Sequence, residues 1–149
     1  MKNTSFIDEQ SHGVFIISTT PFAKDGSIDF DSVDSLVEFY IEKRVSGITI
    51  LGMMGEANKL CANESENFVK HVIKRVNNRV PVVVGVSNVG LQNLVRLSQF
   101  SMDSGCAGMA SHRSNLESKI GIPVIDPVQA AVSMAIHRVI SKSQNYTKL

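Results

Sequence analysis

A cysteine flanked by small residues, Cys106 in the stretch SGCAGMA, is the first residue of this chain whose type and setting could do chemistry. A thiolate can act as a nucleophile or as an acid/base where its surroundings lower the pKa of the thiol. Cysteine is also among the residues most often buried, so the alternative is a small, packed and inert side chain. The polar turn before Cys106, at the end of a predicted helix, favours this alternative.

Metal and disulfide chemistry is not indicated by the remaining residues of this kind. Cys61 lies far from Cys106 in the sequence, and the chain has no CxxC pair or Cys/His ligand spacing. The four histidines are scattered, at His12, His71, His112 and His137. We therefore expect no metal site, no disulfide and no cofactor.

The elements that would position these residues alternate between short β-branched runs and longer stretches of helical period, which is typical of βα units around a parallel sheet. Strands are predicted at 13–18, 47–52 and 81–86, and helices at 31–44, from a capping box of Asn63 and Glu66 to Val76, and at 90–103. A short helix at 113–119, a strand at 122–125 and a helix from Asp126 follow.

Three clear βα units and a fourth, shorter one indicate an α/β fold. A closed eight-stranded barrel needs roughly 250 residues, so we expect a partial (β/α) barrel. The regular alternation of predicted strands and helices changes after residue 104. We therefore divide the chain into a segment over 1–104 and a segment over 105–149, packed as one globular unit.

Composition narrows the range of partners. The 149 residues carry a net charge of +1 and are 43% hydrophobic, which suits one soluble domain with a sizeable core. No basic run is long enough to follow a phosphate backbone, and no apolar run approaches the roughly 18 residues of a membrane span. We expect a cytoplasmic protein that binds neither nucleic acid nor membrane.

Three ordered motifs carry a resemblance to a known family: TTPF at 19–22, GMMGE at 52–56 and PVVVG at 81–85. Over residues 13 to about 108 the chain resembles the dihydrodipicolinate synthase and N-acetylneuraminate lyase family of class I aldolases. The resemblance implies a (β/α) barrel that acts on a 2-oxo acid such as pyruvate.

In that family the second of these motifs usually reads GTTGE or GSTGE, and its backbone amides hold the substrate carboxylate. By this resemblance the substrate-binding residues of this chain are Thr20, Gly52, Met53, Met54, Gly55 and Glu56. The family's first hydroxyl also relays a proton with a tyrosine, which a thioether cannot do. Carboxylate binding through the backbone is thus expected without the relay.

The lysine that forms the imine in this family lies on a later strand than the resemblance covers. Predicted loops and helices hold Lys24, Lys43, Lys59, Lys70, Lys74, Lys119 and Lys142. Lys59 is the nearest to the GMMGE motif, and the base rate for lysine predicts that it is solvated. We expect a lyase-type chain that stops before its Schiff-base lysine and is inactive.

A second resemblance covers residues 105 to 149. The GCAGM and PVIDPVQAAV motifs are similar to the C-terminal segment of hydantoin racemase and its aspartate/glutamate racemase relatives. This resemblance implies racemisation without a cofactor by two cysteines on opposite faces of the substrate, with Cys106 as the second. Cys61 lies in an unrelated context and is not expected to be the first.

Three readings therefore stay open. The chain is a lyase-type binder of 2-oxo acids, a racemase fragment that uses Cys106, or a non-catalytic domain. For the third reading, an open sheet edge leaves backbone groups unpaired and favours self-association as a homo-oligomer.

Overall fold

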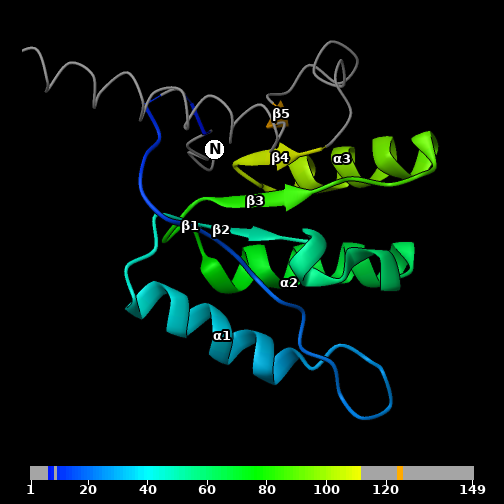
Figure 1. Ribbon diagram of the computed structural model, residues 1–149, viewed down its shortest axis with the longest axis horizontal. Helices are drawn as coiled ribbons and strands as arrows, with labels where there is room; N and C mark the ends of the chain where they lie inside the picture. Colours follow the sequence, from blue (N-terminus) through cyan, green and yellow to red (C-terminus); the bar gives the residue numbers. More distant parts are fainter. Residues whose placement is uncertain (1–6, 9, 112–123, 126–149) are drawn as a thin grey trace, which may run out of the picture.

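The computed structural model describes residues 7, 8, 10–111, 124 and 125. These residues form a parallel sheet whose first four strands are connected by helices (Figure 1). The strands are β1 (Phe15–Ile17), β2 (Gly47–Ile50), β3 (Val82–Gly85), β4 (Gly108–Ala110) and β5 (Val124–Ile125). Their order in the sheet is their order in the chain, and every neighbouring pair is parallel.

The helices α1 (Phe30–Glu42), α2 (Ala62–Val76) and α3 (Leu91–Ser104) connect successive strands. Parallel neighbours joined in chain order by right-handed crossovers place their helices on the same face of the sheet. Helix α2 contacts both α1 and α3, as expected for a layer of helices. The predicted fold class, a partial (β/α) barrel with a parallel sheet, is confirmed.

The core lies between this helical layer and the strands. Helix α2 contributes Phe68, Val69, Val72 and Val76, the buried stripe expected from its periodicity, and the strands contribute Ile48, Ile50, Val84 and Met109. Strand β3 is buried along its whole length, which explains its unbroken run of valines.

The start of α2 differs from the prediction. The helix begins after Cys61, and the carboxylate of Glu64 accepts a hydrogen bond from the Cys61 backbone amide at 2.8 Å. The predicted capping box of Asn63 and Glu66 is therefore wrong. Glu66 is free for another role because it lies beyond the first turn, and its carboxylate pairs with Arg96 of α3.

Part of the predicted C-terminal region lies outside the described residues. This is true of the helix at 113–119 and of the helix from Asp126. The predicted strand at 122–125 is represented by β5, which pairs with β4. Among the described residues, no helix is long and apolar enough to cross a membrane.

Candidate functional site

The chain between β2 and α2, residues 51–60, forms the candidate site and is called the β2–α2 loop. Two short 3₁₀ turns, at Met53–Gly55 and Ala57–Lys59, build most of it. Leu51 and Glu56 bracket the first turn, and both have left-handed backbones, with φ of 53° and 52°. Side-chain-bearing residues rarely adopt this conformation, and it concentrates at functional sites.

Hydrogen bonds hold the first turn in place. The amide of Gly55 donates to the Gly52 carbonyl at 3.0 Å, and that of Glu56 donates to the Met53 carbonyl at 3.1 Å. The hydroxyl of Thr20, a buried residue in the chain after β1, donates to the Gly55 carbonyl at 2.7 Å. Thr20, predicted to bind substrate, thus positions the loop.

Gly85 at the end of β3 supports the loop from the neighbouring strand. A Cβ at this position would lie 2.3 Å from the carbonyl oxygen of Leu51, so only glycine allows the two backbones to approach. Sequence reasoning did not assign this role to Gly85. The signal available was a glycine that ends a run of valines, which is typical of close backbone approach.

The amides of Met53 and Met54 have no acceptor among the described residues. Within the described part of the chain neither donates a hydrogen bond, and their side chains are 85% and 62% exposed. Successive free N–H groups in a tight turn make an anion-binding concavity. The described loop can therefore accept an anion through its backbone, whereas its thioethers cannot donate a proton.

Glu56 and Lys59 form an ion pair across the second turn. The Lys59 side chain is 65% exposed, as its predicted solvated role requires. The other described lysines, Lys24, Lys43, Lys70 and Lys74, are also exposed. An imine-forming lysine is usually desolvated in a pocket, and none of the described lysines meets that condition.

Cys106 lies at the opposite, N-terminal end of the sheet, just before β4. It is 0% exposed, and its sulfur contacts the sulfur of Met102 at 3.5 Å. Burial raises the pKa of the Cys106 thiol to about 11, although the Gly108 amide acts in the opposite direction. The structure does not bring Cys106 and the β2–α2 loop together, and this environment suits the packed, inert alternative.

A cavity of about 210 Å³ adjoins the loop between the first turns of α2 and α3. Its lining includes Leu51 and Cys61, together with the Glu66 carboxylate, which pairs with the Arg96 Nε at 2.6 Å. The exposed Cys61 thus lies beside the loop, whereas the buried Cys106 does not line this cavity.

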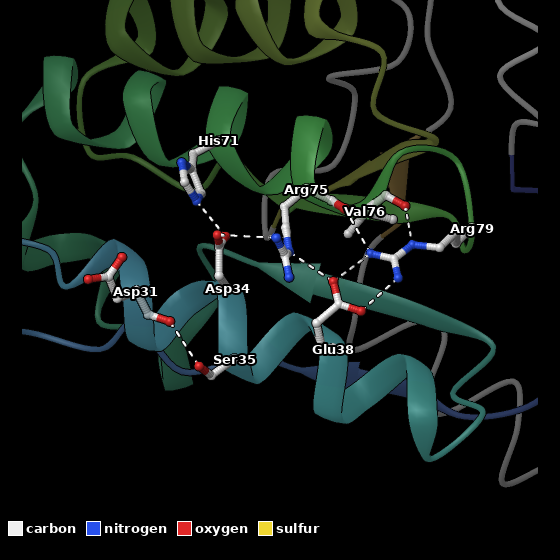
Figure 2. Close-up of polar contacts among 8 residues, drawn as sticks. All are labelled: Asp31, Asp34, Ser35, Glu38, His71, Arg75, Val76 and Arg79. Atoms are coloured by element: carbon white, nitrogen blue, oxygen red, sulfur yellow. Dashed lines mark hydrogen bonds and ion pairs between the residues drawn. The ribbon is translucent and has the colours of Figure 1, made fainter.

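Charged side chains also gather on the outer surface between α1 and α2 (Figure 2). Glu38 lies 2.8 Å from Arg75 and 2.7 Å from Arg79, and Asp34 lies 2.7 Å from His71. Hydrogen bonding and the positive charge of Arg79, aided by Arg75, lower the pKa of Glu38 to about 2. Each of these charges has a partner, so this cluster joins the two helices.

The described residues contain no group of three or more His, Cys, Asp or Glu side chains that could hold a metal ion.

Comparison with known proteins relates this arrangement to a family. The sequence model of the "Dihydrodipicolinate synthetase family" matches residues 10–112. A 4-hydroxy-tetrahydrodipicolinate synthase of Sorangium cellulosum is 34% identical over 98 residues, which are 65% of this chain and 33% of the relative. The chain spans 32% to 45% of the length of such curated relatives.

Solved structures agree with this. Dihydrodipicolinate synthase from Rhodopseudomonas palustris superposes with a TM-score of 0.69 and 42% identity, over 72% of this chain and 35% of that one. A prophage protein of the dihydrodipicolinic acid synthase family from E. coli K12, solved in complex with pyruvate, gives a TM-score of 0.67 and 25% identity, over 75% and 43% of the two chains. By sequence and by fold, this chain belongs to the dihydrodipicolinate synthetase family.

Proposed function

We propose that the β2–α2 loop binds the carboxylate of a 2-oxo acid such as pyruvate, as the first half of a lyase-type site. The observation that carries the proposal is a pair of amides, at Met53 and Met54, that have no acceptor in the described part of the chain and lie between two left-handed residues at the carboxyl end of β2. Active sites of (β/α) barrels lie at this end of the strands. The relative from E. coli K12 that was solved with pyruvate supports the choice of ligand.

The proposed contribution of the described residues is binding and orientation, without covalent chemistry. Free amides can stabilise a carboxylate through charge-assisted hydrogen bonds, which are about twice as strong as neutral ones. The exposed methionine side chains beside these amides offer no hydroxyl for a proton relay. A Schiff base would need a desolvated amine, and the described lysines are solvated.

An NMR titration of ¹⁵N-labelled protein with pyruvate tests the proposal. The amide signals of Met53 and Met54 are expected to shift with saturation, while acetone, which has the ketone but lacks the carboxylate, leaves them in place. Borohydride added with pyruvate is expected to leave the five described lysines unmodified in peptide mass spectra. Saturable shifts elsewhere with none at these two amides would refute the proposal.

The racemase reading depends on Cys106 in the described GCAGM motif, whereas most of its second motif, PVIDPVQAAV, lies outside the described residues. A thiol whose pKa is raised by burial is a poor acid/base at neutral pH, which favours the carboxylate-binding proposal. If the racemase reading holds, deuterium from solvent will enter the chiral carbon of a hydantoin or amino acid, and Cys106→Ser will abolish the exchange. An absence of exchange in the unaltered chain would end this alternative.

Self-association is a separate proposal, and it rests on the edge of the described sheet. Among the described strands, β1 pairs only with β2, and Val14 and Ile17 along this edge are 64% and 50% exposed. Unpaired strand edges with apolar side chains favour pairing with another chain. Light scattering is expected to show a dimer or larger species, and a compact monomer of 16.3 kDa would contradict it.

A further inference from the structure

The methionines of the described chain fall into two environments. Met53 and Met54 are adjacent in the first 3₁₀ turn, with 85% and 62% exposure. Met109 on β4 is fully buried, and Met102 on α3 is partly buried with its sulfur against the thiol of Cys106. Among the described methionines, the side chains most exposed to solvent are therefore those of the candidate binding turn.

We infer that Met53 and Met54 form an oxidation-sensitive site, at which hydrogen peroxide converts exposed thioethers to sulfoxides and thereby weakens carboxylate binding by the β2–α2 loop. In this step the sulfur attacks one peroxide oxygen, the O–O bond breaks, an S–O bond forms and water leaves. Sulfur loses two electrons, and the peroxide gains them. The effect on binding rests on the proposed function, whereas the selectivity of oxidation does not.

The local geometry links the modification to binding. A sulfoxide oxygen is a strong acceptor and cannot donate, so it competes with a carboxylate for nearby N–H donors. The backbone amides of Met53 and Met54 belong to the same two residues and donate to no acceptor in the described part of the chain. An oxidised turn can thus satisfy its own amides, where the reduced turn leaves them for a ligand.

The turn can accept this change without unfolding. Its backbone is fixed from below by the Thr20 hydroxyl on the Gly55 carbonyl and by the Gly52 and Met53 carbonyls, which accept from Gly55 and Glu56. Neither methionine side chain takes part in these bonds. Oxidation therefore alters the exposed rim of the turn while its support stays in place.

The experiment is limited peroxide treatment followed by peptide mass mapping and pyruvate titration. The background is Cys61→Ser, because the exposed Cys61 thiol would otherwise consume oxidant. Sulfoxide is expected at Met53 and Met54 at least about tenfold faster than at Met109, because burial withholds that sulfur from solvent. Met1 and Met134, outside the described residues, are read from their own peptides.

Pyruvate affinity after oxidation is expected to fall about fivefold, the loss of roughly one hydrogen bond. Methionine sulfoxide reductases, one for each epimer, are expected to restore it. In the double variant Met53→Leu/Met54→Leu, peroxide is expected to leave pyruvate affinity unchanged, whatever the affinity of the untreated variant is. Met102→Leu keeps both loop sulfurs and is expected to respond like the parent.

Two results would overturn the inference. Equal rates of oxidation at Met53, Met54 and Met109 would remove the selective site. Selective oxidation with unchanged pyruvate affinity would remove its effect on binding. Failure of the reduced protein to bind pyruvate refutes the proposed function instead, because selective sulfoxidation is measured by mass and needs no ligand.

Discussion

The two ends of one parallel sheet hold the two candidate sites, and they differ in how their polar groups are satisfied. At the carboxyl end, the β2–α2 loop has two amides that donate to no described acceptor, and two of its residues adopt left-handed conformations. At the amino end, the Cys106 amide donates to Ser101 and the Ala107 amide donates to Val82, and the Cys106 side chain has no exposure. Unpaired groups are available to a ligand, whereas paired ones hold the fold together.

The difference follows from the way that helices and strands connect in this fold. Before β4, the chain arrives from the left-handed C-cap of α3 at Gly105 and packs at once against β3. After β2, the chain reaches α2 through two 3₁₀ turns, and a cavity adjoins them. A reactive residue type alone does not mark a site, because the thiol of Cys106 is buried at the packed end.

The largest expected effect comes from removing the close backbone approach that supports the loop. In Gly85→Ala the new Cβ would lie 2.3 Å from the Leu51 carbonyl oxygen, and we expect the free energy of unfolding to fall by about 3 kcal/mol. Gly108→Ala, on the adjacent strand, meets its nearest atom at 3.8 Å and should cost less than about 1 kcal/mol. Equal losses in urea unfolding would break the contrast between the two ends.

Thiol labelling examines the amino end. The rise of the Cys106 pKa from 9.0 to about 11 lowers its thiolate fraction about 100-fold at pH 8. Iodoacetamide is therefore expected to label the exposed Cys61 quickly and Cys106 at least about 100-fold more slowly, as read by mass spectrometry. Both should react fully in denaturant. Native-state labelling of Cys106 at the rate of Cys61 would show that its pocket is open.

Thr20→Val removes the hydroxyl that supports the first turn of the loop. The Gly55 carbonyl would lose a buried partner at 2.7 Å, and we expect a loss of about 2 kcal/mol in the free energy of unfolding together with weaker pyruvate binding. Thr20→Ser keeps the donor and should restore most of both properties. If the valine variant binds pyruvate as the parent does, the loop does not depend on this bond.

Ser101 offers a gain in stability at the packed end. Its buried hydroxyl has no partner among the described residues, whereas the Ser98 hydroxyl on the same helix donates to the Leu94 carbonyl at 2.8 Å. We expect Ser101→Ala to stabilise the protein by about 1 kcal/mol, because it removes an unpaired polar group. Ser98→Ala should give no gain. Equal shifts of the thermal unfolding midpoint in the two variants would contradict the expected difference between the Ser101 and Ser98 hydroxyls.

The smallest expected effect concerns the ion cluster of α1 and α2, which lies at neither end of the sheet. Because Arg79 and Arg75 lower the Glu38 pKa from 4.5 to about 2, its stabilising contribution is complete above pH 4.5 and is lost as the pH falls toward 2. Glu38→Gln should reduce the change of the urea midpoint with pH over this range. Glu42 has no ion pair among the described residues, so Glu42→Gln should leave the pH dependence of the urea midpoint as in the parent.

Much of the fold could be predicted because it depends on local patterns. Alternating β-branched and helical stretches predicted β1 to β3 and the helices between them, and the apolar period of α2 predicted its buried stripe. The start of α2 was misplaced at Asn63, because Asn63 and Glu66 have the spacing of a capping box, whereas in the structure Glu64 accepts from the Cys61 amide and Glu66 pairs with Arg96. The boundary at residue 104 stays a prediction, although β4 continues the same sheet.

For the site, the sequence by itself determined the family and the place of the GMMGE motif after a buried strand. Only the tertiary structure decided that Thr20 supports the loop, that Gly85 must lack a side chain, and that Cys106 is enclosed. The physical reason is distance along the chain. Periodicity reports which face of one element is buried, whereas contacts such as Thr20 to Gly55 and Gly85 to Leu51 arise only when separate βα units pack side by side.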